Sequence, residues 1–86
     1  MTIWKFPIEL ANRQKVLMPE GANILCVQMQ GAAACLWAVV QPTRPKSARQ
    51  IRTFGTGDPV DEGSQRYIGT YQTGDGAFVW HVFEEL

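Results

Sequence analysis

A long stretch without charge places the strongest constraint on how this chain can fold. No charged residue occurs from Gly21 to Thr43. Polar residues and a glycine interrupt the stretch, so it does not suit a membrane helix. Residues 23–30 and 34–41 are apolar on both faces, and Gly31-Ala32-Ala33 offers a tight connection between them. The pattern predicts an antiparallel hairpin that is covered on both faces.

Alternation of apolar and polar residues dominates the rest of the chain. It predicts further strands at Ile3–Glu9, Arg13–Met18, Arg49–Phe54, Arg66–Gln72 and Ala77–Phe83. Pro7 indicates that the first is an edge strand, and Thr73-Gly74-Asp75-Gly76 is a strong turn signal between the last two. No segment shows a helical period of useful length. The sequence therefore predicts an all-β fold, a small antiparallel β-sandwich or flattened barrel of about six to seven short strands.

Chain length limits the size of the core. The 86 residues are expected to form a single β domain, residues 1–86. A domain of this size buries only about 60% of its unfolded surface. Such a core does not hide all of the aromatic residues, and covering both faces of the hairpin takes a second sheet or another subunit. We therefore expect a homo-oligomer.

The N-terminus and the cysteines bear on the location of the protein. Met1–Phe6 lacks the features of a signal peptide, and no run of about 18 apolar residues exists. We therefore expect a cytoplasmic protein in which Cys26 and Cys35 are reduced, buried thiols. They would face each other across a Gln30-Gly31 connection, whereas a turn centred on Gly31-Ala32 offsets them by two residues.

The charges balance, with eight basic and eight acidic residues and a net charge of zero. Proteins that bind nucleic acid over a broad surface usually carry a basic excess, so nucleic acid is not expected as a partner. A local basic segment remains, made of Arg44, Lys46, Arg49 and Arg52. It is either an anion contact or a solvated loop and edge strand protected by charge.

Residues 55–59, Gly-Thr-Gly-Asp-Pro, form a glycine-rich loop. The loop lacks the third glycine and the following helix of a dinucleotide fingerprint, and it lacks the Gly-Lys-Ser/Thr of a Walker loop. Its backbone N–H groups can still form a nest for an anion. The alternative is a bulged strand end followed by a turn. The candidate binding residues for a small anionic ligand are Arg49, Arg52, Thr56, Gly57, Asp58 and Arg66.

Histidine and tyrosine raise two further expectations. His81 is the only histidine, and no nucleophile or set of metal ligands accompanies it in the sequence. We therefore expect a packed His81, no metal, no cofactor and no enzymatic activity. Tyr67 and Tyr71 are predicted to share a strand face, where Gly69 between them leaves room for a neighbouring backbone or a flat ligand. Aromatic packing across the strands beside the glycine is the alternative.

The ordered motifs of the chain carry a family resemblance. They are TIWKF at Thr2–Phe6, MPEGA at Met18–Ala22, CLWAVV at Cys35–Val40, GTGDP at Gly55–Pro59, YIGT at Tyr67–Thr70 and WHVFE at Trp80–Glu84. With these motifs along nearly its whole length, the sequence resembles a family of small phage and prophage proteins of unknown function. Many members carry His where this chain has Asp58, so the resemblance assigns no catalytic residue.

The resemblance implies a function by context rather than by mechanism. Small phage accessory proteins act by binding, so we expect a non-enzymatic accessory protein of this kind in the host cytosol. It would be an anti-defence protein that blocks a host protein or sequesters an anionic nucleotide. The alternative is a minor structural or assembly component of the phage particle, in which the uncharged hairpin and the aromatic residues serve packing between proteins.

Overall fold

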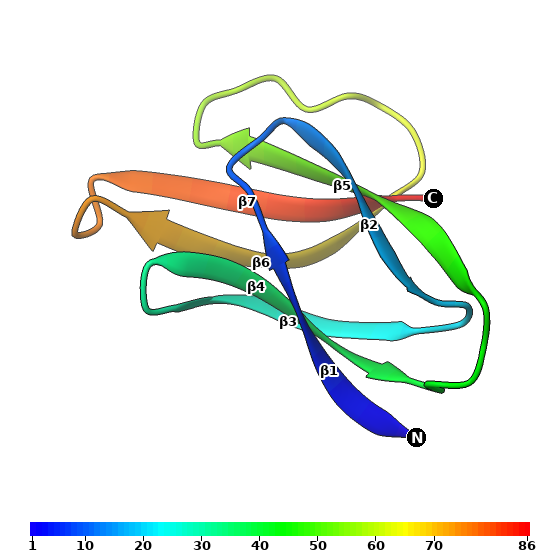
Figure 1. Ribbon diagram of the computed structural model, residues 1–86. Coiled ribbons are helices and arrows are strands. Elements are labelled where there is room, and N and C mark those ends of the chain that lie inside the picture. Colours follow the sequence, from blue (N-terminus) through cyan, green and yellow to red (C-terminus); the bar gives the residue numbers. More distant parts are fainter.

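The computed structural model describes residues 1–86 and contains strands but no helix (Figure 1). Seven antiparallel strands form two sheets, one in the order β1-β4-β3 and the other in the order β2-β5-β7-β6. The strands are β1 Thr2–Ile8, β2 Arg13–Pro19, β3 Asn23–Gln30, β4 Ala33–Val40, β5 Lys46–Gly55, β6 Gln65–Thr73 and β7 Phe78–Glu85. The predicted all-β fold with a sandwich-like arrangement of short strands is confirmed.

The first sheet is built on the hairpin that the uncharged stretch predicts. β3 and β4 pair antiparallel, and Gly31-Ala32 connects the last pair, Gln30 and Ala33. Gly31 has a φ of 60°, which glycine adopts without strain. β1 pairs with the other side of β4 and is an edge strand, as Pro7 predicted.

The second sheet has β5 and β7 in its middle and β2 and β6 at its edges. β5 begins at Lys46, earlier than predicted, so it includes most of the basic segment. β5 lies between β2 and β7, but its pairing with β7 begins at Gln50. Of the basic segment, therefore, only Arg52 lies where β5 is bonded on both sides, and the interpretation as a charge-protected edge strand is wrong for that residue. β6 and β7 join through the predicted turn, where Gly74, Asp75 and Gly76 have positive φ.

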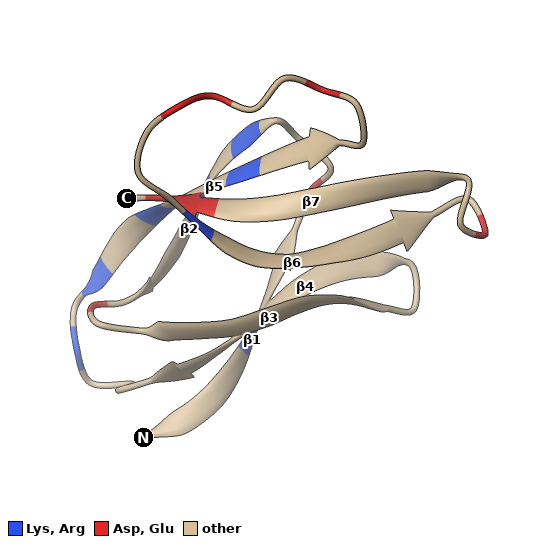
Figure 2. Ribbon diagram, turned by 180° about the vertical axis from the view of Figure 1, so that it is seen from behind, with Lys and Arg blue, Asp and Glu red and all other residues tan.

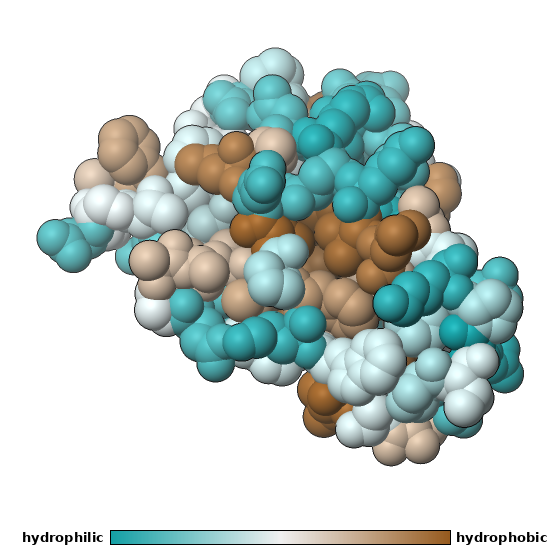
Figure 3. All heavy atoms as spheres, in the orientation of Figure 1, coloured by the Kyte–Doolittle hydropathy of each residue, from teal (hydrophilic) through white to brown (hydrophobic).

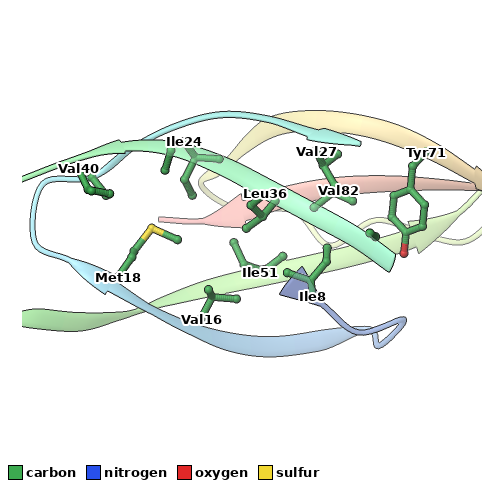
Figure 4. Packing of buried hydrophobic residues seen from close by; sticks show 13 residues of the cluster. Ile8, Val16, Met18, Ile24, Val27, Leu36, Val40, Ile51, Tyr71 and Val82 are labelled. Carbon is green, nitrogen blue, oxygen red and sulfur yellow. The ribbon is translucent and has the colours of Figure 1, made fainter. Parts of the chain in front are cut away.

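Apolar side chains from both sheets meet in one core. Figure 4 shows Leu36 of β4 and Ile51 of β5 pointing toward one another from opposite layers. Burial of such side chains is the main favourable term in folding. The cluster consists of Ile8, Val16, Met18, Ala22, Ile24, Val27, Ala34, Leu36, Ala38, Val40, Ile51, Tyr71 and Val82.

The second sheet covers only one face of the uncharged hairpin. Alternate residues of β4 face the core, and those between them lie on an outer face that no other strand covers. On this outer face Lys5 Nζ donates a hydrogen bond to Gln30 Oε1 at 2.6 Å. Cys35 is buried there, whereas Trp37 and Val39 are only half-buried. Both faces of the hairpin were expected to be covered, but within one chain the second sheet covers only the inner face.

The two sides of the sandwich differ. β3 and β6, an edge strand from each sheet, lie side by side. On the opposite side, β1 and β2 are edge strands that do not pair with each other. Figure 3 shows apolar atoms at the surface between them, bordered by hydrophilic atoms. The sandwich is thus closed along one side and open along the other.

A bulge in β6 separates its two tyrosines. The register with β7 shifts between Tyr67 and Gly69, so Ile68 is an extra residue in the strand. Tyr67 is exposed, whereas Tyr71 is buried in the core cluster. Burial raises the pKa of Tyr71 above its usual range. The prediction that the two rings share a face is therefore wrong.

Candidate functional site

Two of the predicted binding arginines share a buried carboxylate, that of Glu84, whose side chain is 5% exposed. Arg49 pairs with Glu84 through Nε and through Nη2, the latter at 2.9 Å from Oε1. Its Nη1 donates to the carbonyl oxygen of Ala22 at 2.9 Å. Arg66 donates from Nη2 to Glu84 Oε1 at 3.1 Å. All three side-chain nitrogens of Arg49 are therefore engaged within the protein.

Arg52 lies on the other face of β5 and is bonded to the β5–β6 loop and to the last strand. Its Nη1 donates to Asp61 Oδ2 at 2.7 Å and to Glu85 Oε2 at 3.3 Å. Its Nε donates to the carbonyl oxygen of Asn12 at 3.2 Å, and the guanidinium carbon lies 4.8 Å from the centre of the Phe54 ring. The hydrogen bond with Asp61 raises the pKa of Arg52 and lowers the pKa of Asp61.

A cavity of about 290 Å³ lies beside Arg52. Arg13 also lines it, with its guanidinium 3.7 Å from Asp61 and 3.5 Å from Glu85. The charged side chains that line the cavity are Arg13, Arg52, Asp61, Glu62 and Glu85. Because carboxylates outnumber guanidinium groups, the cavity offers no excess positive charge to an anion.

The glycine-rich loop holds a carboxylate of its own. Asp58 Oδ2 accepts the backbone N–H of Gly55 at 2.8 Å, and the N–H of Asp58 donates to the carbonyl oxygen of Gly55 at 3.0 Å. The N–H of Thr56 donates to the carbonyl oxygen of Val79 at 3.2 Å. Gly57 has a φ of 93°, which favours glycine. Most backbone donors of this loop are thus occupied, and one of them already binds a carboxylate.

His81 stands in a chain of hydroxyl groups on the outer face of the second sheet. Its Nε2 lies 2.8 Å from Thr56 Oγ1, and its Nδ1 lies 3.1 Å from Thr70 Oγ1. The chain continues to the Tyr67 hydroxyl, 2.5 Å from Thr70 Oγ1. Since a hydroxyl both donates and accepts, these partners suit either tautomer of the imidazole. The chain therefore holds the ring in place without selecting one ring nitrogen as a base.

A groove of about 390 Å³ runs along the ends of β5 and β7; we call it the aromatic groove. The rings of Phe78 and Trp80 stack there, with centroids 6.2 Å apart and planes at 21°. Phe78 is 59% exposed, whereas Trp80 packs against the core and donates from Nε1 to Thr73 Oγ1 at 3.0 Å. The residues that line the groove are Gly55, Thr56, Asp58, Ala77, Phe78, Val79 and Trp80, of which only Asp58 is charged.

The structure distributes the predicted binding residues over separate places. Arg49 and Arg66 meet at Glu84, Arg52 lies on the outer face with Asp61, and Thr56, Gly57 and Asp58 belong to the loop at the end of β5. Thr56 and Asp58 border the aromatic groove together with residues of β7. The arginines and the glycine loop therefore do not form one site in this chain.

Sequence reasoning missed the aromatic side of this groove. Phe78 and Trp80 alternate along one strand, which predicts that they share a face, but nothing in the sequence places that face against the glycine loop. The sequence also does not indicate which acidic residues the arginines pair with. Glu84 lies on a different strand from Arg49 and Arg66, and Asp61 lies in the loop that follows the strand of Arg52. No group of His, Cys, Asp and Glu side chains in the structure is arranged to hold a metal ion.

Fold and site together define a small β-sandwich domain in which the arginines Arg49, Arg52 and Arg66 pair with carboxylates of the same chain. Over residues 1–86 the chain matches the sequence profile of a domain of unknown function, DUF7352, and it belongs to that family. No curated protein and no solved structure matches the chain. The structure contains no helix with the length and hydrophobicity that a membrane crossing requires.

Proposed function

We propose that this protein is a non-enzymatic phage or prophage accessory protein that acts by binding. In this proposal it works in the host cytoplasm as a homo-oligomer and blocks a host protein as an anti-defence factor. The observation that carries the proposal is the uncovered outside of the β1-β4-β3 sheet. The apolar residues of this outer face are Ile3, Leu25, Cys26, Trp37 and Val39, and Lys5, Gln28 and Gln30 lie beside them on the same face.

Cross-strand pairing makes this outer face continuous. Trp37 of β4 is opposite Lys5 on one side and Cys26 on the other, and Val39 is opposite Ile3. Ile3 is 57% exposed and Leu25 46%. An apolar patch of this kind on a small domain commonly marks a protein interaction surface. A second copy packed face to face would cover it, as the second sheet covers the inner face.

The polar groups favour a protein partner over an anionic nucleotide. Arg49 and Arg52 are largely buried and pair with carboxylates, so neither offers a free guanidinium to a phosphate. Arg66 is more exposed but is also bonded to a carboxylate, that of Glu84. They also favour binding over catalysis. A general base is normally oriented by a third group, but the ring nitrogens of His81 contact only threonine hydroxyls.

Native mass spectrometry of gently purified protein tests the proposal. We expect an oligomer, and we expect Ile3→Lys to shift it to the monomer because the substitution places a charge on the apolar outer face. Leu17→Lys is the matched control, since Leu17 is 61% exposed and Ile3 57%, and Leu17 lies on edge strand β2 of the other sheet. A monomeric wild type, or equal effects of both variants, would contradict the proposal. Co-purification with phage particles would instead favour a structural role.

A further inference from the structure

A carboxylate and an indole ring both lie close to Gly55 in the aromatic groove. A Cβ built on Gly55 would lie 3.1 Å from Asp58 Oδ2 and 3.2 Å from Trp80 Cζ3. A side chain at position 55 would therefore crowd both the carboxylate and the ring. Gly55 allows both groups to reach the same part of the groove.

The groove presents negative charge and no positive charge. Asp58 is its only charged residue. Asp58 Oδ2 accepts a hydrogen bond from Gly55, and Oδ1 forms no hydrogen bond within the protein. Figure 2 shows the same polarity on a larger scale, since the end of the molecule with the β6–β7 turn carries acidic positions and no basic ones. This end attracts a cation and repels an anion.

The aromatic pair adds a surface that suits a flat cation. The Trp80 and Phe78 rings are nearly parallel, and Phe78 remains largely exposed. A cation over the face of an aromatic ring is attracted by its π electrons. A guanidinium is planar, stacks on aromatic faces and donates paired hydrogen bonds to a carboxylate, whereas an ammonium is a more strongly hydrated point charge.

We propose that the aromatic groove binds a guanidinium group, that of an arginine side chain on a partner protein. The guanidinium stacks on Phe78 and donates to the free Oδ1 of Asp58. An anion would meet an uncompensated carboxylate there, and a neutral ring would bury that carboxylate without neutralising it. This inference rests on the proposed function as a binding protein, and it names the chemical group of the partner that would be bound. It does not depend on the oligomeric state.

The test is a titration with Nα-acetyl-arginine amide, followed in ¹H–¹⁵N spectra through the indole N–H of Trp80 and the amide of Gly55. Because the probe makes one stacked contact and one charged contact, we expect a dissociation constant on the order of 1 mM. The citrulline analogue has nearly the same shape without the charge, and we expect it to bind at least tenfold more weakly. Equal binding of the two probes, or shifts confined to the surroundings of Asp61, would overturn the proposal.

Two groove variants and one control separate the site from the general negative field. Asp58→Asn keeps an oxygen for the Gly55 N–H and removes the charge, and we expect at least tenfold weaker binding of the arginine probe. Phe78→Leu removes the stacking surface, and we expect a several-fold loss even if Asp58→Asn disturbs the loop. Asp75→Asn removes the same charge from the nearby turn, where Asn tolerates the positive φ. The proposal fails if Asp75→Asn weakens binding as much as Asp58→Asn does.

If the wild-type spectra show probe binding at the groove while native mass spectrometry finds only monomer, the inference stands and the proposed oligomer fails. The reverse result retains the oligomer and removes the guanidinium site. The two failures are therefore distinguishable.

Discussion

A Cβ placed on Gly69 of β6 would lie 2.9 Å from Cγ1 of Val27 on β3, and 3.5 and 3.6 Å from the backbone N and O of the same residue. The two edge strands thus approach each other closely where β6 has no side chain. The room beside Gly69 is filled by the side chain and backbone of Val27; a neighbouring backbone was one of the possibilities that the sequence left open. This contact closes one side of the sandwich.

Substitution of Gly69 tests the close approach. Gly69→Ala forces the added methyl group against Val27, so we expect a loss of about 1–3 kcal/mol in the free energy of unfolding by urea. Val27→Ala removes the nearest atom, so the double variant is expected to lose less than the sum of the single losses. Additive losses would show that the two strands do not meet at this point.

The carboxylate of Glu84, which Arg49 and Arg66 share, gives a second prediction. Glu84→Gln leaves the guanidinium of Arg49 without its anion among groups that are largely buried. We expect a loss of about 3 kcal/mol in the free energy of unfolding, measured with urea at neutral pH. The cost arises because a buried charge without a partner is poorly solvated.

Arg66 supplies the matched comparison, because it contacts the same carboxylate from a side chain that is 45% exposed. Solvent screens such a contact, so Arg66→Ala is expected to cost no more than about 1 kcal/mol. If Arg66→Ala and Glu84→Gln cost the same, Arg49 is not the main partner of Glu84.

Acid should weaken the link between the β5–β6 loop and Arg52. The hydrogen bond from Arg52 holds the pKa of Asp61 below its ordinary value of 3.8, so the folded state binds fewer protons at this group than the unfolded state. The stabilisation is present above that ordinary value and is lost as pH falls through the lower pKa of the folded state. We expect Asp61→Asn to flatten this part of the curve of unfolding free energy against pH, and an unchanged curve would contradict the assignment.

Local chemistry explains how much of the fold could be predicted. The hairpin at Gly31 and the turn at Asp75 depend on neighbouring residues, and strand alternation reports directly which face is buried. The bulge at Ile68 could not be predicted in the same way. The adjacent apolar residues Tyr67 and Ile68 and the glycine after them are compatible with a bulge, but only the pairing with β7 shows which residue is extra.

The contacts of the candidate site also divide into those that the local sequence can suggest and those that it cannot. That Asp58 accepts the N–H of Gly55 is a contact over a few residues, and turn chemistry could have suggested it. The pairing of Arg49 with Glu84 joins two strands that are distant in the chain. Their charges are visible in the sequence, but whether they pair or stay free for a ligand depends on the register of the sheet.

The two cysteines give a final prediction. In the observed register Cys26 is opposite Trp37 and Cys35 is opposite Gln28, so the thiols sit at diagonal positions. Diagonal positions are about 7–8 Å apart, beyond the Cα separation that a disulfide tolerates. When the folded protein is exposed to mild oxidant and is then unfolded for a thiol titration, we expect to find two free thiols. In the folded protein we expect only one thiol to react quickly with an alkylating reagent.

The fast thiol is expected to be Cys26, because Cys35 is 1% exposed and Cys26 is only partly buried. Mass spectrometry after brief alkylation should therefore show one label on the wild type, one on Cys35→Ser and none on Cys26→Ser. If the proposed second copy covers the apolar outer face, labelling of Cys26 also slows as protein concentration rises, because only the monomer exposes it. Fast labelling of Cys35 would mean that the outer face of β4 opens readily in solution.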